Sequence, residues 1–271
     1  GSRAGIALHA SVPDYHTSGA WIAVTCAGLG ARALELDEQT MRHAIGIAEY
    51  HGPRSQMMRA IDHPTMVKDG SGFGAMVGTS AAYLAASGFT GAPAITVEGE
   101  DVAVHWADLG ERWMIHEQYF KPYPVCYWAQ APIAAALSLL DKHQVHADQI
   151  EHVECVSFHE AIRLAARAPE NTEQAQYSLP FPVASASVHG TVGPEEVRGE
   201  SLSNPETLRL SRSVKLGERD DYNDAFPARR FASVNFVLKD GTRLESGDFE
   251  PVGIPQNPLS KADLDSKYLT Y

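Results

Sequence analysis

Two segments in the first half of the chain consist almost entirely of small and apolar residues. Residues 19–34 read GAWIAVTCAGLGARAL, and residues 74–88 read GAMVGTSAAYLAASG. A helix that is apolar nearly all round must be buried among other helices, and Ala, Gly and Ser let neighbouring backbones approach closely. We therefore predict two packed helices inside a helical domain, with Gly88 as the C-cap of the second.

Further helix signals lie on both sides of these segments. Asp37 is placed to cap a helix over EQTMRHAIGIAEY, whose apolar residues recur at helical spacing. Residues 3–10 resemble the end of a helix already under way, and SKADLDSKYLTY, residues 260–271, predicts a helix with a serine cap. Because both chain ends fall within helical patterns, we expect missing flanking segments or a tight oligomer.

The pattern changes after about residue 119. APIAAALSLLDKH predicts a helix, IEHVECVSF a strand, and TEQAQYSLPFPVASASVHG a helix with an irregular start at its prolines. RFASVNFVLKDGTRLESG predicts a hairpin, and its Asp240-Gly241 pair suits a type I′ turn. The expected fold class is α plus α+β. It comprises a large all-helical domain (1–118), a smaller α+β domain with helices on an antiparallel-containing sheet (119–255), and a C-terminal helix (256–271) returning to the helical domain.

Composition excludes several classes of function. The 271 residues carry a formal net charge of −12 and contain no basic run, so we expect no nucleic-acid partner. No run of 18 apolar residues exists, so we expect no membrane span. The three cysteines show neither disulfide nor metal spacing, which favours a reducing, cytoplasmic location. His143 and His146 have a spacing that two metal ligands use, but their polar helix end favours a solvated face and no metal.

The glycines that follow Lys68 raise the question of nucleotide binding. Residues 63–91 read HPTMVKDGSGFGAMVGTSAAYLAASGFTG. A P-loop requires its lysine after the last glycine, and a dinucleotide fingerprint requires a strand and a spacing that this stretch lacks. We therefore interpret the glycines as close backbone packing at a helix start. Lys68 lies before that helix, where it is suited to hold a carboxylate or to move a proton.

Several segments in order resemble the MmgE/PrpD family, which includes 2-methylcitrate dehydratase, cis-aconitate decarboxylase and iminodisuccinate epimerase. They are DYHTSGAW (14–21), AIGIAEYHGPRSQMM (44–58), the stretch at 63–91, KPYPVCYWAQAPIAAAL (121–137) and TEQAQYSLPFPVA (172–184). The resemblance implies a helical and an α+β domain, a homodimer, no metal or organic cofactor, and proton transfer beside a carboxylate of a di- or tricarboxylate. It also implies a further N-terminal segment that supplies part of the active site.

The resemblance also assigns roles to individual residues. His16 matches the family's histidine after an aromatic residue, and Lys68 matches its active-site lysine. Two positions depart from the pattern. Gln130 stands where the dehydratases and decarboxylases often have a histidine, and Phe181 stands where they often have a tyrosine. Each departure removes a proton donor or acceptor.

The candidate catalytic residues are His16 and Lys68. A histidine suits acid–base work at neutral pH, although a loop histidine bonded to backbone and a lysine reaching solvent are the alternatives. Arg54, in a Gly-Pro turn, suits a carboxylate clamp, and the alternative is a surface ion pair. The candidate substrate-binding residues are Arg54, Tyr15, Thr17, His63, Lys121, Tyr123 and Gln130.

Three functions remain open at this point. The favoured one is a cofactor-independent dehydratase or decarboxylase acting on a polycarboxylate. An epimerase or isomerase of an amino- or imino-dicarboxylate is the second, and Gln130 favours it because elimination needs an acid for the leaving group. An inactive fragment or a binding scaffold is the third.

Overall fold

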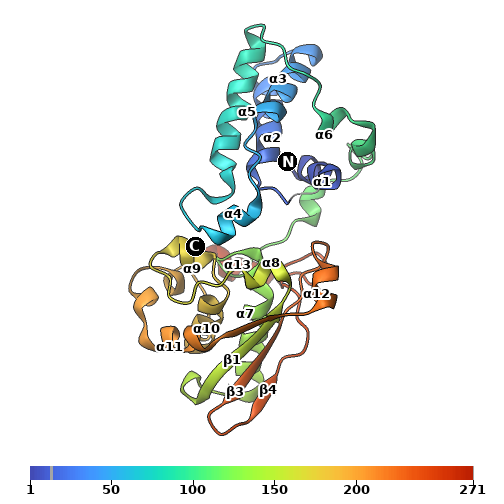
Figure 1. Ribbon diagram of the computed structural model, residues 1–271. Helices are drawn as coiled ribbons and strands as arrows, with labels where there is room; N and C mark the ends of the chain where they lie inside the picture. The colour runs from blue at the N-terminus through green and yellow to red at the C-terminus, as the bar shows by residue number, and fades with distance from the viewer. Residues whose placement is uncertain (13–14, 271) are drawn as a thin grey trace. The chain divides into compact units, whose positions relative to one another are not determined.

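The computed structural model describes residues 1–12 and 15–270, which form two compact units (Figure 1). The first unit is Gly1–His116, and the second begins at Glu117. No helix within the described residues is long and apolar enough to cross a membrane.

Within residues 1–12 and 15–116, every regular element of the first unit is a helix. Its elements are α1 (Ser2–Ser11), α2 (Gly19–Ala33), α3 (Glu38–His51), α4 (Met57–Asp62), η1 (Lys68–Gly70), α5 (Ser71–Ala86), α6 (Ile95–Glu98) and η2 (Glu100–His105), followed by η3 (Met114–Glu117). The helices predicted over 19–34 and 74–88 are confirmed as α2 and α5.

The core of the first unit lies where α2, α3 and α5 pack together (Figure 1). Its fully buried side chains are almost all alanine: Ala23, Ala27, Ala31, Ala44, Ile47, Ala48, Ala81 and Ala85. The backbones are so close that a Cβ atom on Gly78 would lie 2.3 Å from the carbonyl oxygen of Ala23. The small residues therefore allow close helix packing, as the sequence predicts.

Both predicted helix ends are confirmed. The Asp37 carboxylate accepts a hydrogen bond from the Thr40 backbone N–H at 2.7 Å, which caps α3. Gly88 has a φ of +88°, and the next residue, Phe89, donates its N–H to the Leu84 carbonyl at 3.0 Å. This arrangement closes α5 with a left-handed glycine.

Arg3 anchors the irregular end of the first unit to α1. Arg3 is 7% exposed, and its guanidinium donates to the carbonyls of His105 and Arg112, each at 2.7 Å. It also forms an ion pair with Asp108, and this hydrogen bond lowers the pKa of the Asp108 carboxyl. A single buried cation therefore holds three points of a segment with little regular structure.

The second unit contains helices and a sheet, which confirms the α plus α+β fold class. Its elements are η4 (Tyr127–Ala129), α7 (Gln130–His143), η5 (Ala147–Gln149), β1 (Ile150–Ser157), α8 (His159–Ile162), α9 (Thr172–Gln176), α10 (Pro180–His189), η6 (Glu195–Val197), η7 (Gly199–Ser203), α11 (Pro205–Ser213), β2 (Lys215–Glu218), α12 (Asp220–Ala225), β3 (Ser233–Leu238), β4 (Arg243–Glu245) and α13 (Lys261–Thr270).

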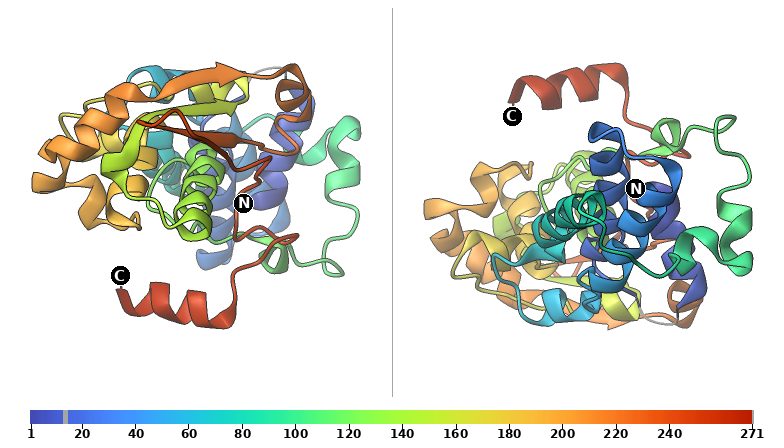
Figure 2. Two further views of the ribbon diagram at one scale, coloured as in Figure 1. Left: turned by 90° about the horizontal axis from the view of Figure 1, so that it is seen from below. Right: turned by 90° about the horizontal axis from the view of Figure 1, so that it is seen from above.

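The four strands form a mixed sheet in the order β2-β1-β3-β4. β1 runs antiparallel to β3, with Val153 opposite Phe236, and parallel to β2, with Cys155 opposite Leu216. Val153, Cys155 and Phe236 are fully buried, while α7 packs against β3 and α11 against β1 (Figure 2). One face of the sheet is therefore the core of this unit.

The predicted hairpin exists, but its predicted type I′ turn is wrong. That turn needs a positive φ at both central residues, and only Gly241 (+86°) has one in the Asp240-Gly241 pair. Gly241 donates its N–H to the Leu238 carbonyl, and Leu238 donates to Thr242. The connection is therefore a three-residue loop that ends in a left-handed glycine.

Two further expectations change. The segment 172–190 forms two helices, not one, because Pro180 occupies the first turn of α10, where its missing N–H costs nothing. The short strand β2 has no clear sequence signal.

The serine cap of the last helix is confirmed: the Ser260 hydroxyl and the Asp263 backbone N–H lie 3.1 Å apart. Tyr271 lies outside the described residues, and a return of this helix to the helical domain stays a prediction.

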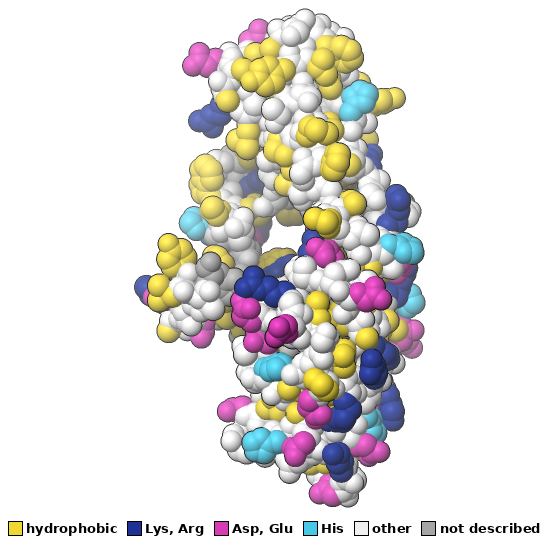
Figure 3. Space-filling view, turned by 90° about the vertical axis from the view of Figure 1, so that its left-hand side faces the viewer, with side chains coloured by type: hydrophobic (Ala, Val, Ile, Leu, Met, Phe, Trp, Pro, Cys, Tyr) yellow, Lys and Arg dark blue, Asp and Glu magenta, His cyan; other side chains and the backbone are white. Residues whose placement is uncertain are grey.

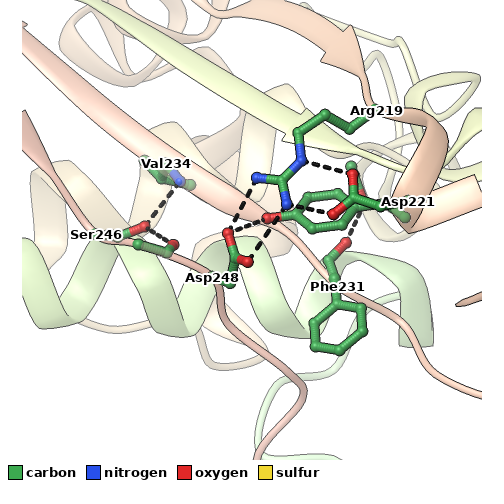
Figure 4. A network of polar contacts seen from close by, with 9 residues as sticks. Arg219, Asp221, Phe231, Val234, Ser246 and Asp248 are labelled. Atoms are coloured by element: carbon green, nitrogen blue, oxygen red, sulfur yellow. Dashed lines mark hydrogen bonds and ion pairs between the residues drawn. The ribbon is translucent and has the colours of Figure 1, made fainter.

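A polar network attaches α12 to the segment after β4 (Figure 4). The Arg219 guanidinium donates to Asp221 at 2.8 Å and to Asp248 at 3.1 Å, and the Tyr222 hydroxyl donates to Asp248 at 2.6 Å. Hydrogen bonds from Tyr222 and Arg219 lower the pKa of Asp248. Because its polar groups bond to one another, with Arg219 between two carboxylates, we interpret this network as structural.

Candidate functional site

The chain segments that carry His16 and Lys68 meet at one end of the first unit. His16 lies just before α2, and Lys68 lies just before α5. The hydroxyls of Ser18 and Ser71, at the starts of these helices, are 2.6 Å apart. A Cβ atom on Gly19 would lie 2.7 Å from the Gly70 carbonyl oxygen. The two helix N-termini are therefore in direct contact.

The turn that presents Lys68 has an unusual backbone. Lys68, Asp69 and Gly70 have φ values of +22°, +55° and +69° in succession. Glycine adopts this region freely, but for lysine and aspartate it is strained and persists only where the surroundings impose it. Such strain is typical of binding and catalytic turns, and here it sets the direction in which the half-buried Lys68 leaves the backbone.

The electrostatics of the two N-termini favour an anion. α2 has 15 residues and α5 has 16, and among the described residues neither helix has a side-chain cap or an acidic residue in its first turn. The first turns of both helices therefore lack acidic and capping side chains, while Asp69 lies in the turn just before α5. Thr17 is 4% exposed, and its hydroxyl oxygen has no hydrogen-bond partner within the part of the chain that the structure describes.

A short pairing of two chain segments holds this end of the unit together. The Tyr15 carbonyl accepts from the Met57 N–H, and the Thr17 N–H donates to the Ser55 carbonyl, both at 2.8 Å. Between them His16 forms an antiparallel bridge with Gln56. The four predicted residues Tyr15, His16, Thr17 and Arg54 consequently share one small region, in which Arg54 is exposed and His16 is half-buried.

His63 occupies a neighbouring position. It follows the last residue of α4, and α4 packs against the Lys68–Gly70 turn. Its side chain is exposed. A binding role for His63 and for Arg54 stays a prediction.

The sequence analysis missed His9, which lies against the His16 segment. Its ring stacks on the Tyr15 ring at 4.6 Å and meets the Trp21 ring edge-on at 5.2 Å. Burial lowers the pKa of His9, and the nearby backbone of His16 opposes this effect without outweighing it. Its Nε2 is buried without a hydrogen-bond partner among the described residues. No motif marks His9, because α1 and the His16 segment come together only in the folded unit.

Acid is expected to destabilise the protein partly through His9. Burial lowers its pKa below the ordinary 6.5, so the unfolded chain takes up the proton first as the pH falls. The contribution to the free energy of unfolding is present above about pH 6.5 and is lost as the pH falls below it. Thermal unfolding of His9→Phe between pH 7.5 and 5 should therefore show a smaller fall in Tm. His51→Phe, at the exposed end of α3, is the control, and an unchanged slope for His9→Phe contradicts the assignment.

Gln130, in the second unit, is held by the backbone. It is fully buried; its Oε1 accepts from the Tyr123 N–H at 3.1 Å, and its Nε2 donates to the carbonyls of Tyr123 and Val125 at 3.0 and 3.2 Å. The amide therefore fixes the KPYP segment. This geometry gives Gln130 a structural role, and we do not include it among the proposed substrate contacts.

Two other candidates lie on the same segment. Burial raises the pKa of Tyr123 to about 12, so its phenol stays protonated at neutral pH and can donate a hydrogen bond but cannot act as a base. Lys121 is exposed, and its carbonyl accepts a hydrogen bond from the Lys267 ammonium. Burial, followed by the nearby charge of Lys121, lowers the pKa of Lys267.

Phe181 and Cys155 are both buried in positions that do not suit a reaction with a substrate. Phe181 is fully buried in the first turn of α10. Cys155 lies inside the sheet core, where burial raises the pKa of its thiol to about 12. Across residues 1–12 and 15–270, no group of three or more His, Cys, Asp or Glu side chains is arranged to hold a metal ion.

Two family models match the chain, one for each part. The model described as MmgE/PrpD N-terminal domain matches residues 2–114, and the model described as MmgE/PrpD C-terminal domain matches residues 123–271. A search of curated proteins gives no match.

Proposed function

The chain belongs to the MmgE/PrpD family, and on that premise we propose that it is a lyase acting on a di- or tricarboxylate. One observation carries the proposal. The segments of His16 and Lys68 meet at two helix N-termini whose first turns lack acidic and capping side chains, beside the buried hydroxyl of Thr17. A substrate carboxylate matches this arrangement, because N–H donors, helix dipoles and an ammonium group all favour a negative charge.

The proposed reaction begins with proton removal next to that carboxylate. Neutral His16 takes the proton from the α-carbon, and the electron pair of the C–H bond moves into the carboxylate to give a dianion. Lys68 and the helix N–H groups stabilise the added charge, which is commonly among the largest contributions to catalysis. The pair then forms a C=C bond as hydroxide leaves the β-carbon with a proton from an acid. In the decarboxylase form no α-proton is removed: carbon dioxide departs, the electron pair of the broken C–C bond stays on the substrate carbon, and protonated His16 gives its proton to that carbanion.

The second candidate is an epimerase, and Gln130 favours it. An elimination needs an acid to protonate the leaving group, and an amide held by backbone hydrogen bonds cannot supply that proton. An epimerase needs no such acid. In that reaction His16 removes the α-proton and Lys68 returns one to the opposite face, so that bonds are remade without a leaving group.

Proton NMR in D₂O separates these candidates. The protein is incubated with citrate-like tricarboxylates and with amino-dicarboxylates, and the spectra are followed for new products and for loss of α-proton signals. An alkene or a decarboxylated product supports the lyase, while deuterium at the α-carbon without a new product supports the epimerase. A protein that does neither with any member of the panel contradicts both and favours a binding scaffold.

We also propose that the protein is a homodimer that pairs through α5. Phe73, Met76, Tyr83 and Leu84 lie on one face of this helix at helical spacing, and their exposed fractions are 63%, 56%, 61% and 43%. Figure 3 shows hydrophobic side chains gathered over the helical unit. A single face that is apolar on both copies suits a two-fold interface, because the same residues meet on each side.

The oligomeric state tests this pairing. Tyr83→Asp is expected to shift the wild-type dimer to monomer in light scattering coupled to gel filtration, because it places two desolvated carboxylates at the interface. Tyr268→Asp is the matched control, since Tyr268 is 84% exposed on α13. A wild-type monomer, or a Tyr83→Asp protein with the wild-type mass, contradicts the proposal.

A further inference from the structure

A hydrogen bond between two serine side chains joins the segments that carry His16 and Lys68. Ser18 follows shortly after His16, Ser71 follows shortly after Lys68, and their hydroxyl oxygens lie 2.6 Å apart although the two residues are 53 positions apart in the chain. Both side chains are half-buried. The proposed reaction gives neither serine a role. This contact, the serine bond, is suited to fix one segment against the other.

Ser18 does not cap its own helix. It occupies the N-cap position of α2, where a serine hydroxyl commonly accepts a hydrogen bond from a backbone N–H of the first turn and so stabilises the helix. Here its φ and ψ are −62° and −21°, in place of extended backbone, and among the described residues its hydroxyl accepts no capping hydrogen bond. Asp37 and Asn204, by contrast, cap α3 and α11 in the ordinary way. The Ser18 hydroxyl therefore serves the contact between two helices instead of its own.

The serine bond lies directly beyond the strained turn at Lys68. Lys68 and Asp69 have φ values of +22° and +55°, which these residue types adopt only where neighbouring contacts impose them. A hydrogen bond within the turn, from the Gly70 N–H to the Val67 carbonyl, is long at 3.3 Å. The serine bond is short at 2.6 Å and starts from the residue after Gly70. It is therefore placed to hold the strained turn at its C-terminal end.

Close backbone packing around the serine bond complements it. A Cβ atom on Gly19 would lie 2.7 Å from the Gly70 carbonyl oxygen, and one on Gly74 would lie 3.0 Å from the Gly19 Cα. Such packing keeps the two helix starts near each other, but it has little directional preference. A hydrogen bond weakens steeply away from its preferred angles. The serine bond therefore adds the directional contact that sets how the turn leaves the start of α5.

We propose that Ser18 and Ser71 are positioning residues, whose shared hydrogen bond holds the strained turn so that the Lys68 ammonium faces the substrate carboxylate. The inference rests on the proposed reaction, in which Lys68 stabilises the charge that develops. A misplacement of about 1 Å in such a group can cost a factor of about a hundred in rate. Without the serine bond, the turn relaxes toward unstrained backbone and carries Lys68 away from its working position.

Amide hydrogen exchange of the full chain tests whether the serine bond holds the turn. In Ser71→Ala, peptides that span residues 65–72 should exchange at least about fivefold faster than in the wild type, because the turn opens more often. Ser18→Ala should give the same increase, and the double variant should add nothing, because each change removes the same bond. Ser80→Ala, at an exposed position of α5, is the matched control and should exchange like the wild type. Exchange at the wild-type rate in both Ser71→Ala and Ser18→Ala overturns the proposal.

Kinetics with the most active compound test whether the serines act through Lys68. Ser71→Ala should lower kcat at least about tenfold and leave KM within about twofold of the wild type, because developing charge is affected more than ground-state binding. Ser71→Thr keeps the hydroxyl and should recover most of the rate. In a Lys68→Met background, Ser71→Ala should lower kcat no further. A loss that adds to that of Lys68→Met, or no recovery in Ser71→Thr, overturns the proposal.

The two measurements separate this inference from the proposed reaction, and circular dichroism verifies that each variant is folded. If the wild type is silent with every compound, the proposed reaction is wrong and hydrogen exchange alone decides the inference: faster exchange in Ser71→Ala supports the holding of the turn, and unchanged exchange overturns it. If the wild type is active and Ser71→Ala keeps the wild-type kcat, the reaction stands and the positioning role is wrong.

Discussion

Lys68→Met is expected to lower the rate of α-proton exchange, and of any elimination that follows it, at least about a hundredfold. Methionine keeps the approximate length and apolar stem of the side chain and removes only the ammonium group. The negative charge that develops on the substrate carboxylate would then be stabilised by helix N–H groups alone. Because the lysine acts on charge that grows during the reaction, the loss should fall mainly on kcat.

Two further variants separate charge from general damage. Lys142→Met makes the same change at an exposed position near the end of α7 and should keep the wild-type rate. Lys68→Arg keeps the charge but replaces a compact ammonium with a planar fork, so partial activity is expected. The measurement is deuterium incorporation by proton NMR with the most active compound. Exchange in Lys68→Met at the wild-type rate would show that Lys68 has no part in the chemistry.

Gly78→Ala is expected to lower the free energy of unfolding by about 2–4 kcal/mol, an amount typical of severe overpacking. The added methyl would lie 2.3 Å from the Ala23 carbonyl oxygen, 2.7 Å from the Cys26 Cβ and 2.8 Å from the Ala27 backbone N. Two of these three atoms are backbone, so relief requires α2 and α5 to separate. Their separation would also pull apart the helix starts that carry His16 and Lys68.

Gly28→Ala is the matched control for this change. Gly28 lies within α2, and a methyl there would meet nothing within 4 Å. Alanine should therefore stabilise the helix by about 0.5–1 kcal/mol through its higher helix propensity. Urea unfolding of the full chain, followed by far-UV circular dichroism, measures both effects. Equal stability of the Gly78→Ala and Gly28→Ala variants would contradict the close packing of the two helices.

The sequence predicted those parts of the fold that depend on local signals. A cap such as Asp37 acts on the next three residues, and a left-handed glycine such as Gly88 acts within one turn, so both are legible in the sequence. The same holds for the serine cap at Ser260 and for the β-branched residues that mark β1. The hairpin turn was misjudged because Asp-Gly fits more than one loop length, and strand pairing selects the length.

The candidate site, like the fold, has parts that the local sequence predicted and parts that only the folded chain shows. His16 and Lys68 were predicted because each lies in a stretch that resembles the MmgE/PrpD family, and their roles stay a prediction. His9 was not, because its importance depends on a ring stack with Tyr15 that no spacing predicts. The amide of Gln130 looked available from sequence alone, and only the folded chain shows that the backbone of Tyr123 and Val125 uses it.

The sequence by itself therefore determined that small-residue helices pack closely, where they begin and end, and which two residues are candidates for proton transfer. The tertiary structure decided that the N-termini of α2 and α5 touch, that β2 pairs with β1 in parallel, and that the hydroxyls of Ser18 and Ser71 bond to each other. The physical reason is the distance along the sequence over which each kind of interaction acts. Caps, turns and helical periodicity are set by residues a few positions apart. A site assembled from distant segments depends on which surfaces exclude water together, and that is fixed only when the chain has folded.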